Sequence, residues 1–318
     1  MILWLIHTTQ LVFTFINLLC VLFDTVLLWC VIKQRVSLSR STGPFVYILF
    51  FTVFGIIEKL NSFLMVDAWP VSEWLEPNGG YEKYRRIMGS YVTFVFLLCY
   101  QTPLLLDCIM TIHRITIFAC PIRSITWFGD RRIAFYCVAA LILLTIWLLI
   151  QQISPCTLNF NALTLFIESG CAPDRHPATW FQNKYLIYVP IFSMVANFLI
   201  LFLQRFSKNS SIFPTATSSG GQLKKGNALI RQAIFIGVYL SVYEILYIHI
   251  RLYPDSFHAM PFELQTITYD IRLLAVGSLN FFVYFVLTKS TRVLILRRLG
   301  FNGGSRNISV SVPTPMKL

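Results

Sequence analysis

Seven long apolar blocks are the feature of this sequence that most constrains its fold. Each is about 20 residues long, which is the length that a helix needs to cross a hydrocarbon core about 30 Å thick. A transmembrane barrel would instead show segments of about ten residues with alternating polarity. A helix also satisfies its backbone hydrogen bonds internally, as lipid requires. We therefore predict an all-α fold, a bundle of seven transmembrane helices. The predicted spans are residues 10–32, 44–65, 91–113, 133–153, 185–204, 229–250 and 266–288.

The distribution of charge excludes a soluble protein and predicts the orientation in the membrane. Only 13% of the residues are charged, whereas soluble domains have about 25%. If the N-terminus lies outside the cell, 18 of the 26 Lys and Arg residues fall in cytoplasmic segments and six in outer segments. Cytoplasmic loops of membrane proteins carry this excess of basic residues. The net charge of +12 therefore marks a cytoplasmic membrane face, and we expect no nucleic-acid partner.

The spans divide the chain into four parts. Residues 1–9 are predicted to be a short extracellular N-terminus, and residues 10–288 the seven-transmembrane domain. Residues 289–300 alternate basic and apolar positions at helical spacing, which predicts a short amphipathic helix at the cytoplasmic surface of the membrane. Residues 301–318 are predicted to be a disordered cytoplasmic tail. The first span lacks a preceding basic segment and a following cleavage site, so we expect a retained signal anchor.

Two of the eight cysteines, Cys156 and Cys171, fall in a predicted outer loop. The extracellular compartment permits disulfides, and we predict that these two cysteines form one; two free thiols are the alternative. No second cysteine pair or nearby histidine cluster completes a metal site. The five histidines lie on different segments, so we expect no metal, no cofactor and no enzymatic activity.

Two short motifs lie at the predicted cytoplasmic ends of the third and seventh spans. His113 and Arg114 are followed by Pro121, and the seventh span ends in Asn280-Phe-Phe-Val-Tyr284. The first motif resembles the D-R-Y…P region of rhodopsin-like G-protein-coupled receptors, and the second resembles their N-P-x-x-Y motif. The whole chain is similar in style to the nematode chemosensory serpentine receptors. The resemblance implies that these five residues form the G-protein coupling and activation switch.

Three departures from the rhodopsin-like pattern limit what the resemblance implies. His113 stands where that family usually has an acid, so an ionic clamp around Arg114 is not expected. The sixth span has no C-W-x-P-like element that would kink it. Gly89 stands at the outer end of the third span, where the family has a cysteine that pairs with the second outer loop. The resemblance therefore implies that Cys156 and Cys171 pair with each other if they pair at all.

Helical spacing gathers polar residues on one face of several spans. Such residues are costly in a membrane and normally face the bundle interior. On the third span this face holds Tyr100, Pro103, Asp107, Met110 and Arg114. On the seventh span it holds Asp270, Leu273, Gly277, Asn280 and Tyr284. A buried network that binds water or Na⁺ is a further hypothesis, formed by Asn17, Asp24, Asp107 and Asn280.

The outer halves of the spans predict a ligand pocket. Acidic and aromatic residues lie there at similar depths, and a pocket of this kind suits a small organic ligand, including one with a positive group. There are two structural alternatives: Glu58 pairs near Lys59 or with Arg272, and the tyrosines form only an interfacial belt. The pocket candidates are Glu58, Tyr188, Tyr243, Glu244, Tyr247, Tyr269 and Asp270.

The motifs favour one function class over its competitors. A retinal protein needs a lysine in the seventh span, and that span has none. A transporter or channel subunit is the alternative, because intramembrane acids also mark ion pathways, although the chain shows no internal repeat. The resemblance favours a chemosensory G-protein-coupled receptor in the plasma membrane, and it suggests a sensory cilium. The implied partners are the lipid bilayer, a small external ligand and a heterotrimeric G protein.

Overall fold

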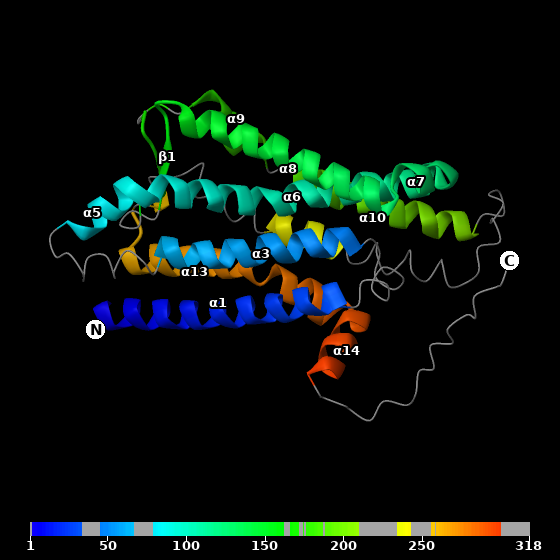
Figure 1. Ribbon diagram of the computed structural model, residues 1–318, viewed down its shortest axis with the longest axis horizontal. Coiled ribbons are helices and arrows are strands. Elements are labelled where there is room, and N and C mark those ends of the chain that lie inside the picture. The colour runs from blue at the N-terminus through cyan, green and yellow to red at the C-terminus, as the bar shows by residue number, and fades with distance from the viewer. Residues whose placement is uncertain are drawn as a thin grey trace.

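In the computed structural model of the protein, helices form an elongated bundle whose long axes run in roughly one direction (Figure 1). The all-α prediction is confirmed, although a short β-hairpin at one end was not predicted. The described residues are 2–33, 45–66, 79–161, 166–171, 174, 176–186, 188–209, 234–242, 256–257 and 259–299.

Four long helices coincide with predicted spans. They are α1 (Ile2–Lys33), α3 (Phe45–Val66), α8 (Asp130–Ile153) and α10 (Tyr188–Asn209). Their outward-facing side chains are apolar, as on α8, where Leu143 is 69% exposed and Ile142 is 55% exposed. This surface suits lipid rather than water, because a soluble protein rarely exposes such a continuous apolar area. The chain is a multi-pass membrane protein.

The third predicted span belongs to the longest continuous helical stretch of the described residues, Gly80–Ala119, and packs among its neighbours. Short helix α5 (Gly80–Tyr84) and π-helical turn η1 (Arg85–Gly89) lead into α6 (Ser90–Ala119). α6 contacts α3, α8 and α10, and it continues past its predicted end at residue 113. It stops at Cys120, whose φ of −140° and ψ of 67° are not helical, because the residue before a proline is disfavoured in the helical region. α7 (Pro121–Trp127) then begins at that proline.

The seventh predicted span is bent. α13 (Phe262–Gly277) and the π-helical segment η2 (Phe281–Leu287) meet at 56°. Within the described residues, five helical stretches are long and apolar enough to cross a membrane, and this bent pair would make a sixth. The sixth predicted span, at 229–250, is described only over residues 234–242, which are helical; the remainder lies outside the described residues.

The two ends of the bundle differ. At the end where the N-terminus lies (Figure 1), strands β1 (Leu158–Asn161) and β2 (Phe166–Ser169) form an antiparallel hairpin with Leu158 opposite Ser169. A disulfide between Cys156 and Cys171 joins the base of this hairpin, and α9 (Pro177–Tyr185) follows it. At the other end lie α7 and α14 (Lys289–Arg298). α14 overlaps the predicted cytoplasmic helix at 289–300, and the predicted tail at 301–318 lies outside the described residues.

Two clusters of buried apolar side chains fill the bundle. One lies around Tyr47, Leu104 and Tyr284 and extends into the helical residues 234–242 through Ile236. The other lies beneath the hairpin, and its members include Phe96, Leu148, Phe160 and Tyr269. The polar faces predicted for the third and seventh spans adjoin these clusters, since Asp107, Met110, Asp270 and Leu273 are all less than 10% exposed.

Candidate functional site

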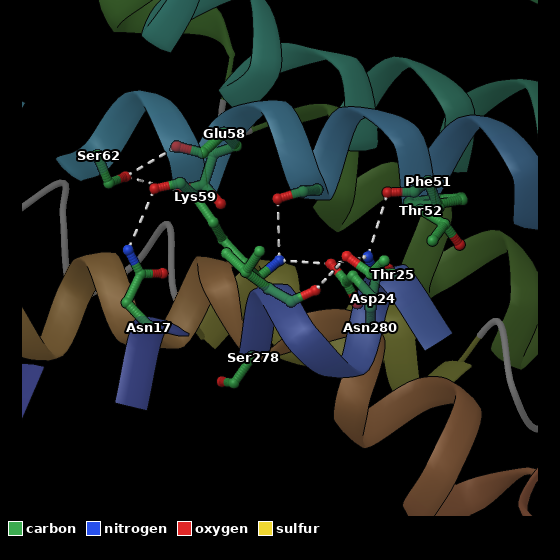
Figure 2. A network of polar contacts seen from close by, with 12 residues as sticks. Asn17, Asp24, Thr25, Phe51, Thr52, Glu58, Lys59, Ser62, Ser278 and Asn280 are labelled. Atoms are coloured by element: carbon green, nitrogen blue, oxygen red, sulfur yellow. Dashed lines mark hydrogen bonds and ion pairs between the residues drawn. The ribbon is translucent and has the colours of Figure 1, made fainter. Parts of the chain in front are cut away.

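A buried ion pair lies where α1, α3 and the bend of the seventh span meet (Figure 2). Lys59 Nζ donates to Asp24 Oδ2 at 2.7 Å, and both side chains are only 1% exposed. The same ammonium donates to the carbonyl of Gly55 at 3.0 Å, one turn earlier on α3. Neither partner could remain charged alone at this depth, because an unpaired buried charge costs several kcal/mol. The pair therefore joins α1 to α3.

Asn280 connects this ion pair to the seventh span. It precedes η2, at the bend, and its Nδ2 donates to Asp24 Oδ2 at 3.0 Å and to the Phe51 carbonyl at 3.2 Å. The three side chains converge above Gly55, where an added Cβ would lie 2.5 Å from Asn280 Nδ2 and 2.9 Å from Asp24 Oδ2. Only glycine allows this approach.

The network predicted from the sequence is therefore partly correct. Asn17, Asp24 and Asn280 do share it, with Asn17 Nδ2 donating to the Lys59 carbonyl at 3.2 Å. Lys59 was not foreseen as its centre, and its ammonium already neutralises Asp24 without a Na⁺ ion. Asp107 lies elsewhere, on α6, where its buried carboxylate interacts with Ser193 of α10 and with Arg114.

A small cavity adjoins the ion pair. Its volume is about 20 Å³, and its lining includes Glu58, Lys59, Cys99, Pro103 and Asn280. Glu58 is 3% exposed, and its carboxylate accepts a long contact of 3.5 Å from Ser62 Oγ. Pro103 has no N–H to donate, so the carbonyl of Cys99, one turn earlier, lacks its usual helical partner. The cavity has room for a water molecule, and Lys59 and Glu58 supply polar partners for it.

The bend of the seventh span is also held from the opposite side. Tyr239, in the helical residues 234–242, donates its hydroxyl hydrogen to the Ala275 carbonyl. The same hydroxyl lies 3.2 Å from Ser278 Oγ. The bend therefore contacts the sixth span through Tyr239 and the first two spans through Asn280. A displacement of the sixth span relative to the seventh must break the Tyr239 contacts.

Arg114 lies near the C-terminal end of α6, five residues before Ala119. Its side chain is half-buried, and its Nη1 is buried without a hydrogen-bond partner in the described part of the chain. The guanidinium is within electrostatic range of Asp107, Tyr47 and Tyr284. His113 does not act as a counter-ion, since its ring stacks on Phe128 with centroids 4.5 Å apart.

The other members of the predicted switch are dispersed. Tyr284 is 3% exposed and packs in the cluster around Tyr47 and Leu104. Asn280 belongs to the ion-pair network, about one turn before Tyr284 along the chain. Pro121 is the first residue of α7. The structure thus brings Arg114 and Tyr284 together, whereas Asn280 belongs to the ion-pair network and Pro121 begins α7.

The predicted ligand pocket is not assembled by the described residues. Tyr188 is 60% exposed on the outward face of α10, so the structure does not bring its side chain together with the other candidates. α10 turns its polar residues inward instead: Asn197 Nδ2 donates to Thr111 Oγ1 of α6 at 3.0 Å. Glu58 lines the small cavity described above. Tyr243, Glu244 and Tyr247 lie outside the described residues.

Tyr269 and Asp270 are buried beneath the hairpin. The ring of Tyr269 stacks on Phe160 of β1, with centroids 5.4 Å apart and an interplanar angle of 20°. The Phe160 backbone N–H donates to Thr93 Oγ1 of α6 at 2.8 Å. The guanidinium of Arg272 lies 6.0 Å from the centre of the Tyr100 ring. Phe160 thus packs into the hairpin end of the bundle, between α6 and α13.

Sequence reasoning missed Lys59, Tyr239 and Phe160. Lys59 is one of the few cations within a predicted span, and a charge inside a membrane requires a partner. That requirement could have indicated its role from the sequence. Tyr239 and Phe160 resemble many other aromatic residues in this chain. Nothing in a single sequence distinguishes them.

Comparison with known proteins gives two matches. Residues 42–198 match the family described as "Caenorhabditis serpentine receptor-like protein, class xa". A Caenorhabditis elegans protein named "Serpentine receptor class XA 10" is 25% identical over 264 residues, which cover 77% of this chain and 74% of that protein. The family match extends from the start of α3 into α10, so it includes Lys59, Arg114 and both disulfide cysteines.

Proposed function

We propose that this homologue of the nematode serpentine receptors is a chemosensory G-protein-coupled receptor that detects a small external chemical. The placement of Arg114 carries the proposal. A basic residue that merely anchors the cytoplasmic side extends its charge into water. Arg114 instead keeps Nη1 buried and without a hydrogen-bond partner in the described region, beside Tyr47 and Tyr284.

The partner would be a helix of a heterotrimeric G protein α subunit. A guanidinium offers several N–H donors, and its hydrogen bonds to backbone carbonyls are charge-assisted and therefore strong. In the resting protein, the half-buried Arg114 would keep its Nη1 beside Tyr47 and Tyr284 and away from water. An outward displacement of the sixth span would open a cleft beside these tyrosines and expose Arg114 to an inserted helix.

The bend of the seventh span offers a route from the outer end to this cleft. Tyr269 lies under the hairpin on α13, and Ser278 and Asn280 lie just beyond the C-terminal end of that helix, at the bend. A ligand that displaces α13 at Tyr269 would weaken the hydrogen bonds of Tyr239 with Ala275 and Ser278. The ligand need only bind better to an arrangement that the receptor already samples, since that difference in affinity sets the shift in population.

The test is Arg114→Ala in a cell-based G-protein assay with a panel of small odorants. Losing about 1.5–3 kcal/mol of charge-assisted hydrogen bonding should weaken coupling about tenfold or more. Arg123→Ala is the matched control, because Arg123 is exposed on α7. At equal surface expression, an Arg114→Ala receptor that signals like the wild type would refute this role.

A transporter or channel remains the competing function, since its ion path would also need intramembrane charges. Among the described residues, however, Asp24 is neutralised by Lys59, and the cavity beside them has room for about one water molecule. Patch-clamp recording of the reconstituted protein separates the two functions. A ligand-gated current in the absence of any G protein would favour the channel.

A further inference from the structure

Helix α9 has the reverse of the polarity expected for a helix in an aqueous outer loop. The side chains that it buries are polar: Thr179 is 5% exposed and Gln182 is 8% exposed. The side chains that it exposes are aromatic: Trp180 is 55% exposed and Phe181 is 51% exposed. A surface helix of a soluble protein buries its apolar face and shows its polar face to water. This arrangement is favourable only if the outward face meets lipid.

The polar face of α9 is fixed to the outer end of α8. Gln151 is 1% exposed near the end of that helix. Its side-chain amide donates to Gln182 Oε1 at 3.1 Å and accepts from Thr179 Oγ1 at 2.8 Å. Because these buried polar groups are paired with one another, α9 cannot rotate its aromatic residues inward without leaving them unsatisfied. The outward aromatic face is therefore a fixed feature of the fold.

The aromatic face continues directly into the lipid-facing side of α10. The exposed apolar positions follow each other at alternating spacings of four and three residues, as on a single helical face. α9 and α10 also run together as one apolar stretch, Pro177–Leu203. The exposed residues of this stripe are Phe181, Tyr185, Tyr188, Phe192, Val195 and Leu199.

A lysine marks the depth of this face. Lys184 Nζ lies 4.7 Å from the centre of the Trp180 ring and 5.6 Å from that of the Tyr185 ring. Tryptophan and tyrosine are enriched where headgroups meet acyl chains. A lysine there rests its apolar stem on the rings and directs its ammonium toward phosphate and water. The combination fits a bilayer interface better than the bilayer centre.

We propose that α9 lies in the outer-leaflet interface, with Trp180, Phe181 and Tyr185 among phospholipid headgroups and the first acyl carbons. The segment predicted as part of an aqueous loop would then be a membrane anchor that holds the end of α8 and the start of α10 at a fixed depth. This inference does not rest on the proposed signalling function, because it concerns only the surface that meets lipid.

Photo-crosslinking tests the proposal on the full-length protein in phosphatidylcholine nanodiscs. The photoreactive residue p-benzoylphenylalanine replaces Phe181 in one variant and Asp174 in another, since both positions are exposed in the outer segment. After irradiation, mass spectrometry should find a phospholipid adduct at position 181 in several-fold higher yield than at position 174. Equal yields would place α9 in water, and a crosslinked dimer would assign the face to a second copy of the chain; either result overturns the proposal.

A second measurement keeps the test independent of crosslinking efficiency. Phosphatidylcholine brominated on its acyl chains quenches nearby tryptophan fluorescence. Trp180→Phe should lower the fraction of fluorescence that these lipids quench. The fraction that is protected from acrylamide in water should stay the same or fall. If Trp180→Phe instead removes mainly the fluorescence that acrylamide quenches, the indole faces water and the proposal fails.

Discussion

At the scale of single residues, the ion pair of Asp24 and Lys59 decides which helices meet. Each side chain is 1% exposed, so each depends on the other for its charge to be tolerated. Removing one partner of a buried pair is far more costly than replacing both with uncharged groups of similar volume. The pair thus specifies the contact of α1 with α3 more than it adds net stability.

This reasoning predicts a non-additive mutant cycle. Lys59→Met should lower the free energy of unfolding by about 3–5 kcal/mol, because it leaves Asp24 buried and uncompensated. Adding Asp24→Asn should restore much of that loss. Thermal unfolding of the purified protein in detergent measures both effects, with Lys184→Met as the control, since Lys184 is exposed. Additive losses in the double mutant would mean that the two charges are not coupled.

At the scale of elements, the bend between α13 and η2 is the point where the spans are tied together. Hydrogen bonds hold it to α1 and α3 through Asn280, and to the sixth span through Tyr239. The apolar pattern of residues 266–288 gives no sign of this bend. Asn280 was on the predicted inner face of the seventh span, and Ser278 is next to Gly277 of that face. A helical pattern, however, cannot show where a helix breaks.

Tyr239→Phe tests the tie to the sixth span. The change removes the hydroxyl that contacts Ala275 and Ser278 while keeping the ring. Losing about 1 kcal/mol of hydrogen bonding should shift the resting equilibrium roughly fivefold toward the signalling state. Basal G-protein activity without ligand is the readout, compared with Tyr91→Phe, whose side chain is 68% exposed on α6. An unchanged basal activity at equal expression would show that these contacts do not restrain the sixth span.

The stability of the hairpin formed by β1 and β2 should depend on the disulfide at its base. Cys156 and Cys171 are separated by 15 residues, and closing a loop of this length stabilises a fold by about 3 kcal/mol. The double variant Cys156→Ser, Cys171→Ser should therefore unfold at a lower temperature. It should also show faster proteolysis between the two positions. Cys120→Ser, which alters an exposed free thiol, should leave both unchanged. A double variant as resistant as the wild type would contradict the assigned bridge.

At the scale of the whole molecule, the apolar blocks were sufficient to predict most of the bundle, because length and hydropathy are properties of each helix alone. α3 at Phe45–Val66 lies within one residue of the predicted span at 44–65. The relative rotation of the helices was not predictable in this way. Tyr188 was assigned to a pocket, whereas α10 turns Ser193 and Asn197 inward, a choice set by their neighbours on α6. The site residues that sequence reasoning missed all depend on such rotations.

Orientation is the property on which the signalling proposal depends, and it has a direct test. The excess of Lys and Arg in segments 33–43, 114–132, 205–231 and 289–318 predicts that these segments face the cytoplasm. An epitope placed after Leu318 should bind antibody only in permeabilised cells, and one placed before Met1 should bind it on intact cells. The N-x-S/T sequences at Asn209 and Asn307 should stay unglycosylated, because they never enter the secretory lumen. Antibody binding at Leu318 on intact cells would put Arg114 outside the cell, where no G protein could reach it.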